Sequence, residues 1–481
     1  KYIADTWVQF SVWLTYLSAD WVATVALGIL SKDSKNPSVD PNFKIMAIWA
    51  PFLLVHLGGP DTITAYSLED NELWLRHLLG LIYQLAVAGL VVHSSWNADN
   101  LNYVTIPVMV AGIIKYGERT WSLWLGSSKK FRESILPPPD PGPNYAKFMD
   151  NYAARKAEGY KVKLIVESTT KLLDHSQRST ANTCVPDASS LPHGFYFFSI
   201  SKSLFADLIL SIQDLQSSQN FFQKLLWEDA FKVIEVELGL MYDKLHTKAV
   251  LTCSRPGIFL KFVTFFCTLF AFITFFCLVD KAHIDYDRII TFVLFAGAIF
   301  LEIYAVIVLL SSSWTMLWLS KLENWEVDLL YKSISCFQTC FKLSHTKRWS
   351  NLMPQFNLIS FCLKDEPVKC INIQKFLRIY QIFEKSFYQL TETVPGELKK
   401  LIFEQLLEKS GHAKDAKACK NLCAHRGDRV IGPDKWKCRS IVWSTEVEFD
   451  QSLLLWHIAT DICYYSDVTD NSNCATSKTV K

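Results

Sequence analysis

The sequence has no excess of either charge, since 49 basic residues stand against 47 acidic ones. A chain with a net charge of only +2 has no overall field to attract nucleic acid, so we expect no nucleic-acid partner. It also contains no glycine-rich phosphate loop, no nucleophile elbow and no paired-motif metal hydrolase signature. These absences argue against an enzyme, and we predict neither catalytic residues nor a cofactor.

Glycosylation signals are missing too, because no Asn-x-Ser/Thr acceptor occurs without an intervening proline. Of the thirteen cysteines, Cys267 and Cys277 lie inside an apolar segment and the other eleven lie in polar parts of the chain. This distribution predicts reduced cytosolic thiols and no disulfides. One group of cysteines and histidines has no standard zinc spacing, so we predict no metal site there: His412, Cys419, Cys423, His425 and Cys438.

Apolar residues make up half of the chain, and they are gathered into stretches of membrane-spanning length. The hydrocarbon core of a bilayer needs roughly 20 apolar residues in a helix, which most of these stretches supply. We therefore predict an all-α polytopic membrane protein with about six transmembrane helices and mainly helical cytosolic domains. The expected spans are residues 7–30, 45–57, 73–96, 103–125, 258–279 and 289–319.

Two of these spans have unusual lengths. The run at 45–57 is short for a crossing and holds Pro51 and His56 before a glycine-glycine-proline breaker. It either crosses the bilayer or enters and leaves on one side, and the sequence leaves both arrangements open. The run at 289–319 is longer than a bilayer requires at about 1.5 Å per residue, so we expect it to tilt or protrude.

Basic residues near the span ends predict the orientation. Lysines and arginines such as Lys129, Lys248 and Arg255 flank two large polar regions, against only Lys281 and Arg288 in the loop between the last two spans. By the positive-inside rule, both polar regions face the cytosol of an endoplasmic-reticulum or plasma-membrane protein. The predicted organisation is a transmembrane block at 1–126, a cytosolic domain at 127–257 opening on a proline-rich linker, a transmembrane hairpin at 258–319 and a C-terminal cytosolic domain at 320–481.

The stretch WAPFLLVHLGGPDTITAYSLEDNELW, residues 49–74, closely resembles the signature of a plant membrane-protein family catalogued as domain of unknown function 4220. Residues 19–24, 112–121 and 137–147 match further blocks of that family. FDQSLLLWHIATD, at 449–461, resembles the domain of unknown function 594 that usually follows it. The resemblance implies a plant protein, usually with another hydrophobic segment before Lys1, from a family discussed mostly around development and defence. It implies no reaction.

Ionisable side chains inside the expected spans are the candidates for function. Each costs roughly 2.5–3.5 kcal/mol on insertion scales, so it normally faces protein, water or a partner. Lys115 and Arg119 lie one helical turn apart beside Glu118, and they either pair with Asp20 or Glu302 across helices or form the basic cytosolic end of their span. The candidate intramembrane polar residues are Asp20, His56, Lys115, Glu118, Arg119 and Glu302.

Four carboxylates follow the breaker at residues 58–60: Asp61, Glu69, Asp70 and Glu72. Broken helices next to carboxylates are typical of sites where membrane proteins coordinate or attract cations. Alternatively, Asp61 caps a new helix and the other three form a solvated acidic face.

Two functions fit these patterns. The first is an oligomeric cation channel or transport protein, in which the intramembrane charges and the acidic segment line a cation path that the cytosolic domains gate. The second is a membrane-anchored scaffold for partner proteins in development or defence signalling, in which the buried charges only hold helices together. The expected partners are the lipid bilayer, further copies of the chain and cytosolic proteins.

Overall fold

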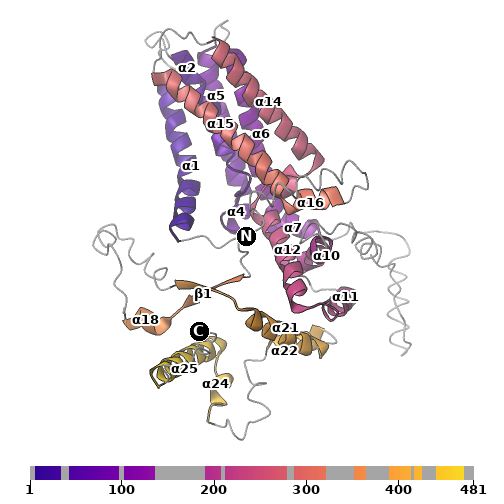
Figure 1. The fold of residues 1–481 in the computed structure, drawn as a ribbon. Coiled ribbons are helices and arrows are strands. Elements are labelled where there is room, and N and C mark those ends of the chain that lie inside the picture. The colour runs from indigo at the N-terminus through magenta and orange to yellow at the C-terminus, as the bar shows by residue number, and fades with distance from the viewer. Residues whose placement is uncertain are drawn as a thin grey trace. The chain divides into compact units, whose positions relative to one another are not determined.

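A computed structural model describes residues 6–33, 43–96, 102–135, 190–206, 208, 212–278, 286–320, 351–363, 389–412, 416–424 and 440–470 (Figure 1). Contacts divide the chain into two units. The bundle unit comprises residues 7–210 and 232–346, and the C-terminal unit comprises residues 1–6, 211–231 and 347–481. The boundaries of these two units differ from those of the four blocks expected from the sequence. The proline-rich linker, His425 and Cys438 lie outside the described residues.

Among the described helices of the bundle unit, four are long and apolar enough to cross a membrane. They are α1 (Thr6–Asp33), α5 (Trp74–Ser94), α14 (Arg255–Leu278) and α15 (Tyr286–Ser311). Large apolar side chains cover their outer faces, and Trp21 of α1, for example, is 76% exposed. Such a surface is favourable against hydrocarbon and unfavourable against water. The prediction of a mostly helical chain with helices able to span a membrane is therefore confirmed.

The expected spans at 45–57 and 103–125 differ in character from these four helices. Residues 45–57 form a broken pair, α2 (Phe43–Ala47) and α3 (Trp49–Leu57). Pro51 explains the break at Ile48, because it has no N–H to donate to the carbonyl of Ala47 and its ring clashes with that carbonyl. The short helix α3 is buried against α5, α6 and α15, with Phe52 and Leu54 inaccessible to solvent.

Helix α6 (Asn102–Gly126) is the central element of the bundle unit and contacts α3, α5 and α14. Its second half carries Lys115, Glu118 and Arg119, all of them buried. Helix α3 approaches it closely at Gly112, where an added Cβ would lie 2.7 Å from the Cβ of Leu54. The absence of a side chain at Gly112 therefore allows α3 and α6 to meet.

A Gly112→Leu substitution should destabilise the bundle unit by about 1–3 kcal/mol, because the new side chain must push α3 away from α6. Thermal unfolding of the purified protein in detergent measures the effect. Gly89→Leu in α5 is the matched control, since nothing lies within 4 Å of a Cβ added there. Equal melting temperatures for both variants would contradict the close approach of α3 and α6.

The run expected as one long span at 289–319 is two helices. Helix α15 ends at Ser311, and α16 (Ser313–Ser320) follows. The backbone N–H of Trp314 donates to the hydroxyl of Ser312, and the Thr315 hydroxyl donates to the Leu309 carbonyl at 2.6 Å. These side-chain bonds satisfy groups that an uninterrupted helix would pair within its backbone, so the expectation of one continuous helix over 289–319 was wrong.

A second hydrophobic core, here called the α7–α16 core, joins shorter helices of the bundle unit. It is formed by α7 (Ser128–Glu133), α10 (Ser190–Phe205), α12 (Trp227–His246) and α16. Helices α10 and α12 meet at Gly194, where an added Cβ would lie 2.5 Å from a methyl group of Val236. Two short helices complete the described part of this unit: α4 (Glu69–Glu72) and α13 (Ala249–Thr252).

The C-terminal unit contains a two-stranded sheet that the sequence prediction of a mainly helical domain missed. Strands β1 (Leu352–Phe356) and β2 (Gln389–Thr393) pair antiparallel, with Leu352 opposite Thr393. Pro354 is tolerated because both strands of a two-stranded sheet are edges. The described helices here are α11 (Ile212–Phe222), α18 (Leu358–Leu363), α21 (Gly396–Gly411), α22 (Ala416–Cys423), α24 (Trp443–Glu446) and α25 (Phe449–Asp470).

Candidate functional site

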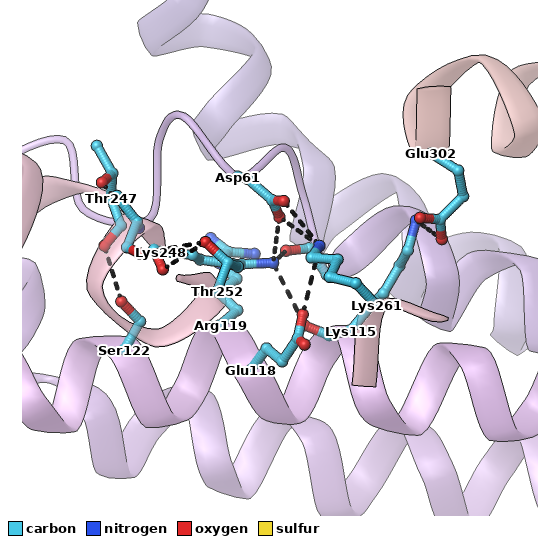
Figure 2. Close-up of polar contacts among 12 residues, drawn as sticks. Asp61, Lys115, Glu118, Arg119, Ser122, Thr247, Lys248, Thr252, Lys261 and Glu302 are labelled. Carbon is cyan, nitrogen blue, oxygen red and sulfur yellow. Dashed lines mark hydrogen bonds and ion pairs between the residues drawn. The ribbon is translucent and has the colours of Figure 1, made fainter. Parts of the chain in front are cut away.

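Ion pairs link Asp61, Lys248, Lys261 and Glu118 into one group, while Lys115–Glu302 and Arg119–Asp20 are separate pairs. These eight described ionisable side chains of the bundle unit are here together called the charge network (Figure 2, which labels all of them except Asp20). They come from α1, α6, α14, α15, the loop after α3 and the junction between α12 and α13. Four are carboxylates and four are cations, so the set is formally neutral. Its members are Asp20, Asp61, Glu118, Glu302, Lys115, Arg119, Lys248 and Lys261.

Asp61 is bound by two lysines from distant parts of the chain. The Nζ of Lys261, in α14, lies 2.7 Å from its Oδ2, and the Nζ of Lys248 lies 3.7 Å from its Oδ1. Burial on its own would raise the pKa of Asp61, but the charges of Lys248 and Lys261 outweigh that effect and lower it. The carboxylate therefore stays ionised and ties the loop after α3 to α14.

Lys248 is 1% exposed, which is rare for a lysine. Its ammonium group donates to the carbonyl of Gly58 at 2.7 Å, and its backbone N–H donates to the carbonyl of Asp61 at 3.1 Å. Burial lowers the pKa of Lys248 to about 8, although Asp61 acts in the opposite direction. Because Gly58 is the C-terminal cap of α3, this lysine satisfies a carbonyl that the helix leaves free.

Arg119 also binds a carbonyl at the C-terminal end of α3. Its Nη1 donates to the carbonyl of Leu57 at 2.9 Å and lies 3.7 Å from Oδ1 of Asp20. Its guanidinium carbon lies 5.4 Å from the centre of the Tyr16 ring, within the range of a cation–π interaction. Two cations thus neutralise the negative end of the α3 dipole inside the bundle.

The remaining contacts join α6 to α15 and α14. The Nζ of Lys115 lies 2.7 Å from a carboxylate oxygen of Glu302, and both side chains are almost fully buried. Glu118 has a longer ion pair, at 3.6 Å from the Nζ of Lys261. Within the described part of the chain, neither oxygen of Glu118 accepts a hydrogen bond. Glu118 is therefore the least satisfied member of the charge network.

The cross-helix alternative from the sequence is the one that the structure favours for the α6 charges. Lys115 pairs with Glu302 and Arg119 with Asp20, and all three charges of α6 are buried, so they do not form a solvated basic end. His56 lies apart from the network, where its Nδ1 is 2.7 Å from the Phe52 carbonyl.

The four carboxylates after the breaker do not gather into one site. Only Asp61 joins the charge network, and it caps no helix, since the next one begins at Glu69. Asp70 accepts the backbone N–H groups of Tyr66 and Ser67, while Glu72 accepts the N–H and hydroxyl of Ser128. Glu69 is exposed. Among the described residues, these carboxylates therefore hold separate local contacts and do not lie together as one site.

Lys261 was not among the site residues predicted from the sequence, and Lys248 was named only as a marker of orientation. A lysine just inside an apolar run is usually interpreted as one that extends towards the headgroups. The position of Lys261 in the sequence could have indicated its role. A side chain near the start of α14 can reach the acidic loop after α3 as easily as the lipid headgroups. Among the described residues, no His, Cys, Asp or Glu side chains are grouped so as to hold a metal ion.

The depressed pKa of Lys248 predicts a pH effect on stability. Between about 8 and its ordinary 10.5, the unfolded chain binds more protons than the folded one, so the contribution of Lys248 to stability rises with pH. Thermal unfolding at pH 7.5 and 9.5 should show this rise, and Lys248→Met should reduce it. Lys400→Met, at an exposed position, is the control. An unchanged pH dependence in Lys248→Met would contradict the assignment.

The pKa of Asp61 has the opposite linkage. Its folded value lies below the ordinary 3.8, so its contribution to stability is present above that pH and is lost as the pH falls through the folded value.

A family model described as "Domain of unknown function (DUF4220)" matches residues 13–362. The match spans more than half of the chain, including every member of the charge network, and it confirms the resemblance to domain of unknown function 4220. No curated protein and no solved structure matches the chain. The function has to be inferred from the charge network itself.

Proposed function

The chain belongs to the DUF4220 family, and we propose that it is a membrane transport protein whose charge network holds the helical bundle closed. One observation carries the proposal. Lys261 lies 2.7 Å from Asp61 and 3.6 Å from Glu118, so one cation is shared by two carboxylates on different segments. A shared partner provides two pairings of similar chemistry, which is what a two-state element requires.

The energetics support a role beyond anchoring. Burying an ion pair costs several kcal/mol per ion, and apolar side chains of similar size often hold helices together as well or better. Eight charges at one site are therefore an expensive way to fix a bundle. Ionisable groups retained at membrane depth usually belong to ion or substrate pathways.

The arrangement argues against a permanently open cation path through one subunit. Each of the four network carboxylates lies within ion-pair distance of a lysine or arginine, which cancels the field that would attract a cation. Conduction would require these pairs to separate. In this proposal the paired charges hold the path closed, and they line it only after the pairs separate.

The proposal includes the finer features expected from the sequence. Helices α3 and α6 complete a set of about six membrane helices. The large polar regions face the cytosol of the endoplasmic reticulum or plasma membrane, and the protein forms homo-oligomers. From the resemblance alone, the chain is of plant origin and residues 449–461 belong to a domain of unknown function 594.

Ion flux into liposomes containing the purified protein tests whether these ion pairs hold the path closed. Glu118→Gln keeps the size of the side chain and removes one of the two carboxylates that share Lys261, so basal cation flux should rise several-fold over the unmodified protein. Glu72→Gln, outside the network, is the control and should leave flux unchanged. Absence of flux in both the protein and Glu118→Gln, across several cations and voltages, would overturn the transport proposal.

A membrane-anchored scaffold is the second candidate, and exposed apolar side chains of the C-terminal unit favour it. Leu401 and Leu406 of α21 and Leu453 of α25 are each more than half exposed, as expected of a surface that binds another protein. This candidate predicts silent liposomes together with partner binding that Leu453→Asp weakens.

A further inference from the structure

Two lysines of the α7–α16 core lie over aromatic rings. The Nζ of Lys202, in α10, is 4.5 Å from the centre of the Phe198 ring, and the Nζ of Lys244, in α12, is 5.8 Å from that of Phe131. Phe131 and Phe198 are buried members of the same core. The two ammonium groups therefore lie on neighbouring parts of one apolar surface.

Neither ammonium group has an ion pair with a carboxylate in the described part of the chain. Burial lowers the pKa of both lysines, and the charge of Lys244 lowers that of Lys202 further. The nearby carboxyl of Glu237 interacts with Ser201, and burial raises its pKa. Two mutually repelling cations without a counter-charge are unfavourable unless an anion binds between them.

A third donor lies beside them. The indole ring of Trp314, in α16, packs edge-on against Phe198 at a centroid distance of 5.5 Å. Its Nε1 is buried and has no acceptor in the described part of the chain. A buried N–H without a partner is unfavourable, so it marks a place where an acceptor is expected.

The position of this core indicates where the acceptor comes from. Helix α7 follows α6 after Ser127 alone, and α16 follows α15 after Ser312 alone. The core thus lies where long apolar helices end, which is the level of lipid headgroups. Tryptophan and lysine are the residues that typically meet headgroups at that level.

We propose that Lys202, Lys244 and the Trp314 Nε1–H form a binding site for the phosphate group of an anionic phospholipid. The two ammonium groups neutralise the phosphate, the indole donates a hydrogen bond to one of its oxygens, and the aromatic rings contact the adjoining glycerol and acyl carbons.

The test compares the full-length protein with two double variants that lose the same charge. Lys202→Gln/Lys244→Gln removes the site, and Lys129→Gln/Arg132→Gln removes two exposed cations of α7. Binding of phosphatidic acid is measured in detergent by the rise in melting temperature, with phosphatidylcholine as reference lipid. The site variant should need at least ten-fold more phosphatidic acid for the same rise, while the α7 variant should match the unmodified protein.

Further measurements keep the result interpretable. Without lipid, the site variant should melt at the same temperature as the unmodified protein or higher, because two repelling charges are gone. Lys202→Arg/Lys244→Arg should retain binding, and Trp314→Phe should weaken it. Equal loss of binding in both double variants would overturn the site. Stabilisation by inorganic phosphate alone, with no advantage for phosphatidic acid, would overturn its assignment to lipid.

Discussion

Replacing Lys115 by methionine should destabilise the bundle unit by about 3–5 kcal/mol, because Glu302 is left as a buried charge without a partner. The pair is suited to this test, since Lys115 is 5% exposed and Glu302 is 2% exposed. The melting temperature in detergent, or the yield of folded protein, reports the loss. Lys130→Met, which removes one end of a surface pair with Glu133, should cost less than about 1 kcal/mol.

The double variant Lys115→Met/Glu302→Gln provides the decisive comparison. It removes both charges, so it should recover most of the stability that Lys115→Met loses. A double variant as unstable as the single one would show that Lys115 matters for its packing and not for its charge.

Asp61→Asn should cause the second large loss, again about 3–5 kcal/mol, because two buried lysines lose the carboxylate that they share. Adding Lys261→Gln removes one of the uncompensated charges and should restore part of the stability. Glu133→Gln is the control: its side chain is 49% exposed and pairs with Lys130 at 3.1 Å on α7, outside the apolar helices, so the cost should stay below about 1 kcal/mol. Equal effects at both positions would contradict the central place of Asp61.

Much of the bundle could be predicted from the length of its apolar runs. The spans expected at 7–30, 73–96 and 258–279 correspond to α1, α5 and α14, because a hydrocarbon layer selects directly for long apolar helices. The break at Ser312 and the pairing of β1 with β2 could not be predicted. Both depend on local hydrogen bonds and on contacts between residues far apart in the sequence, which leave no periodic pattern.

The members of the charge network were easier to predict from the sequence than the pairs that they form. Asp20 and Glu302 were proposed as partners for the α6 charges, since buried charges need compensation. Which carboxylate faces Lys115 and which faces Arg119 depends on the order of helices around the bundle, and apolar patterns do not encode that order. Lys261 was missed for the same reason, because its partner Asp61 lies in a loop 200 residues earlier in the chain.

The enclosed position of α3 bears on how the protein is made. Alone, residues 45–57 are too short to span a bilayer, and α3 ends in carbonyls that Arg119 and Lys248 satisfy. During synthesis, Lys248 and α15 leave the ribosome about 200 residues after α3. At roughly 5–20 residues per second, this delay lasts for many seconds. For those seconds the C-terminal end of α3 lacks Lys248, so its final packing forms only once the second half of the polypeptide is available.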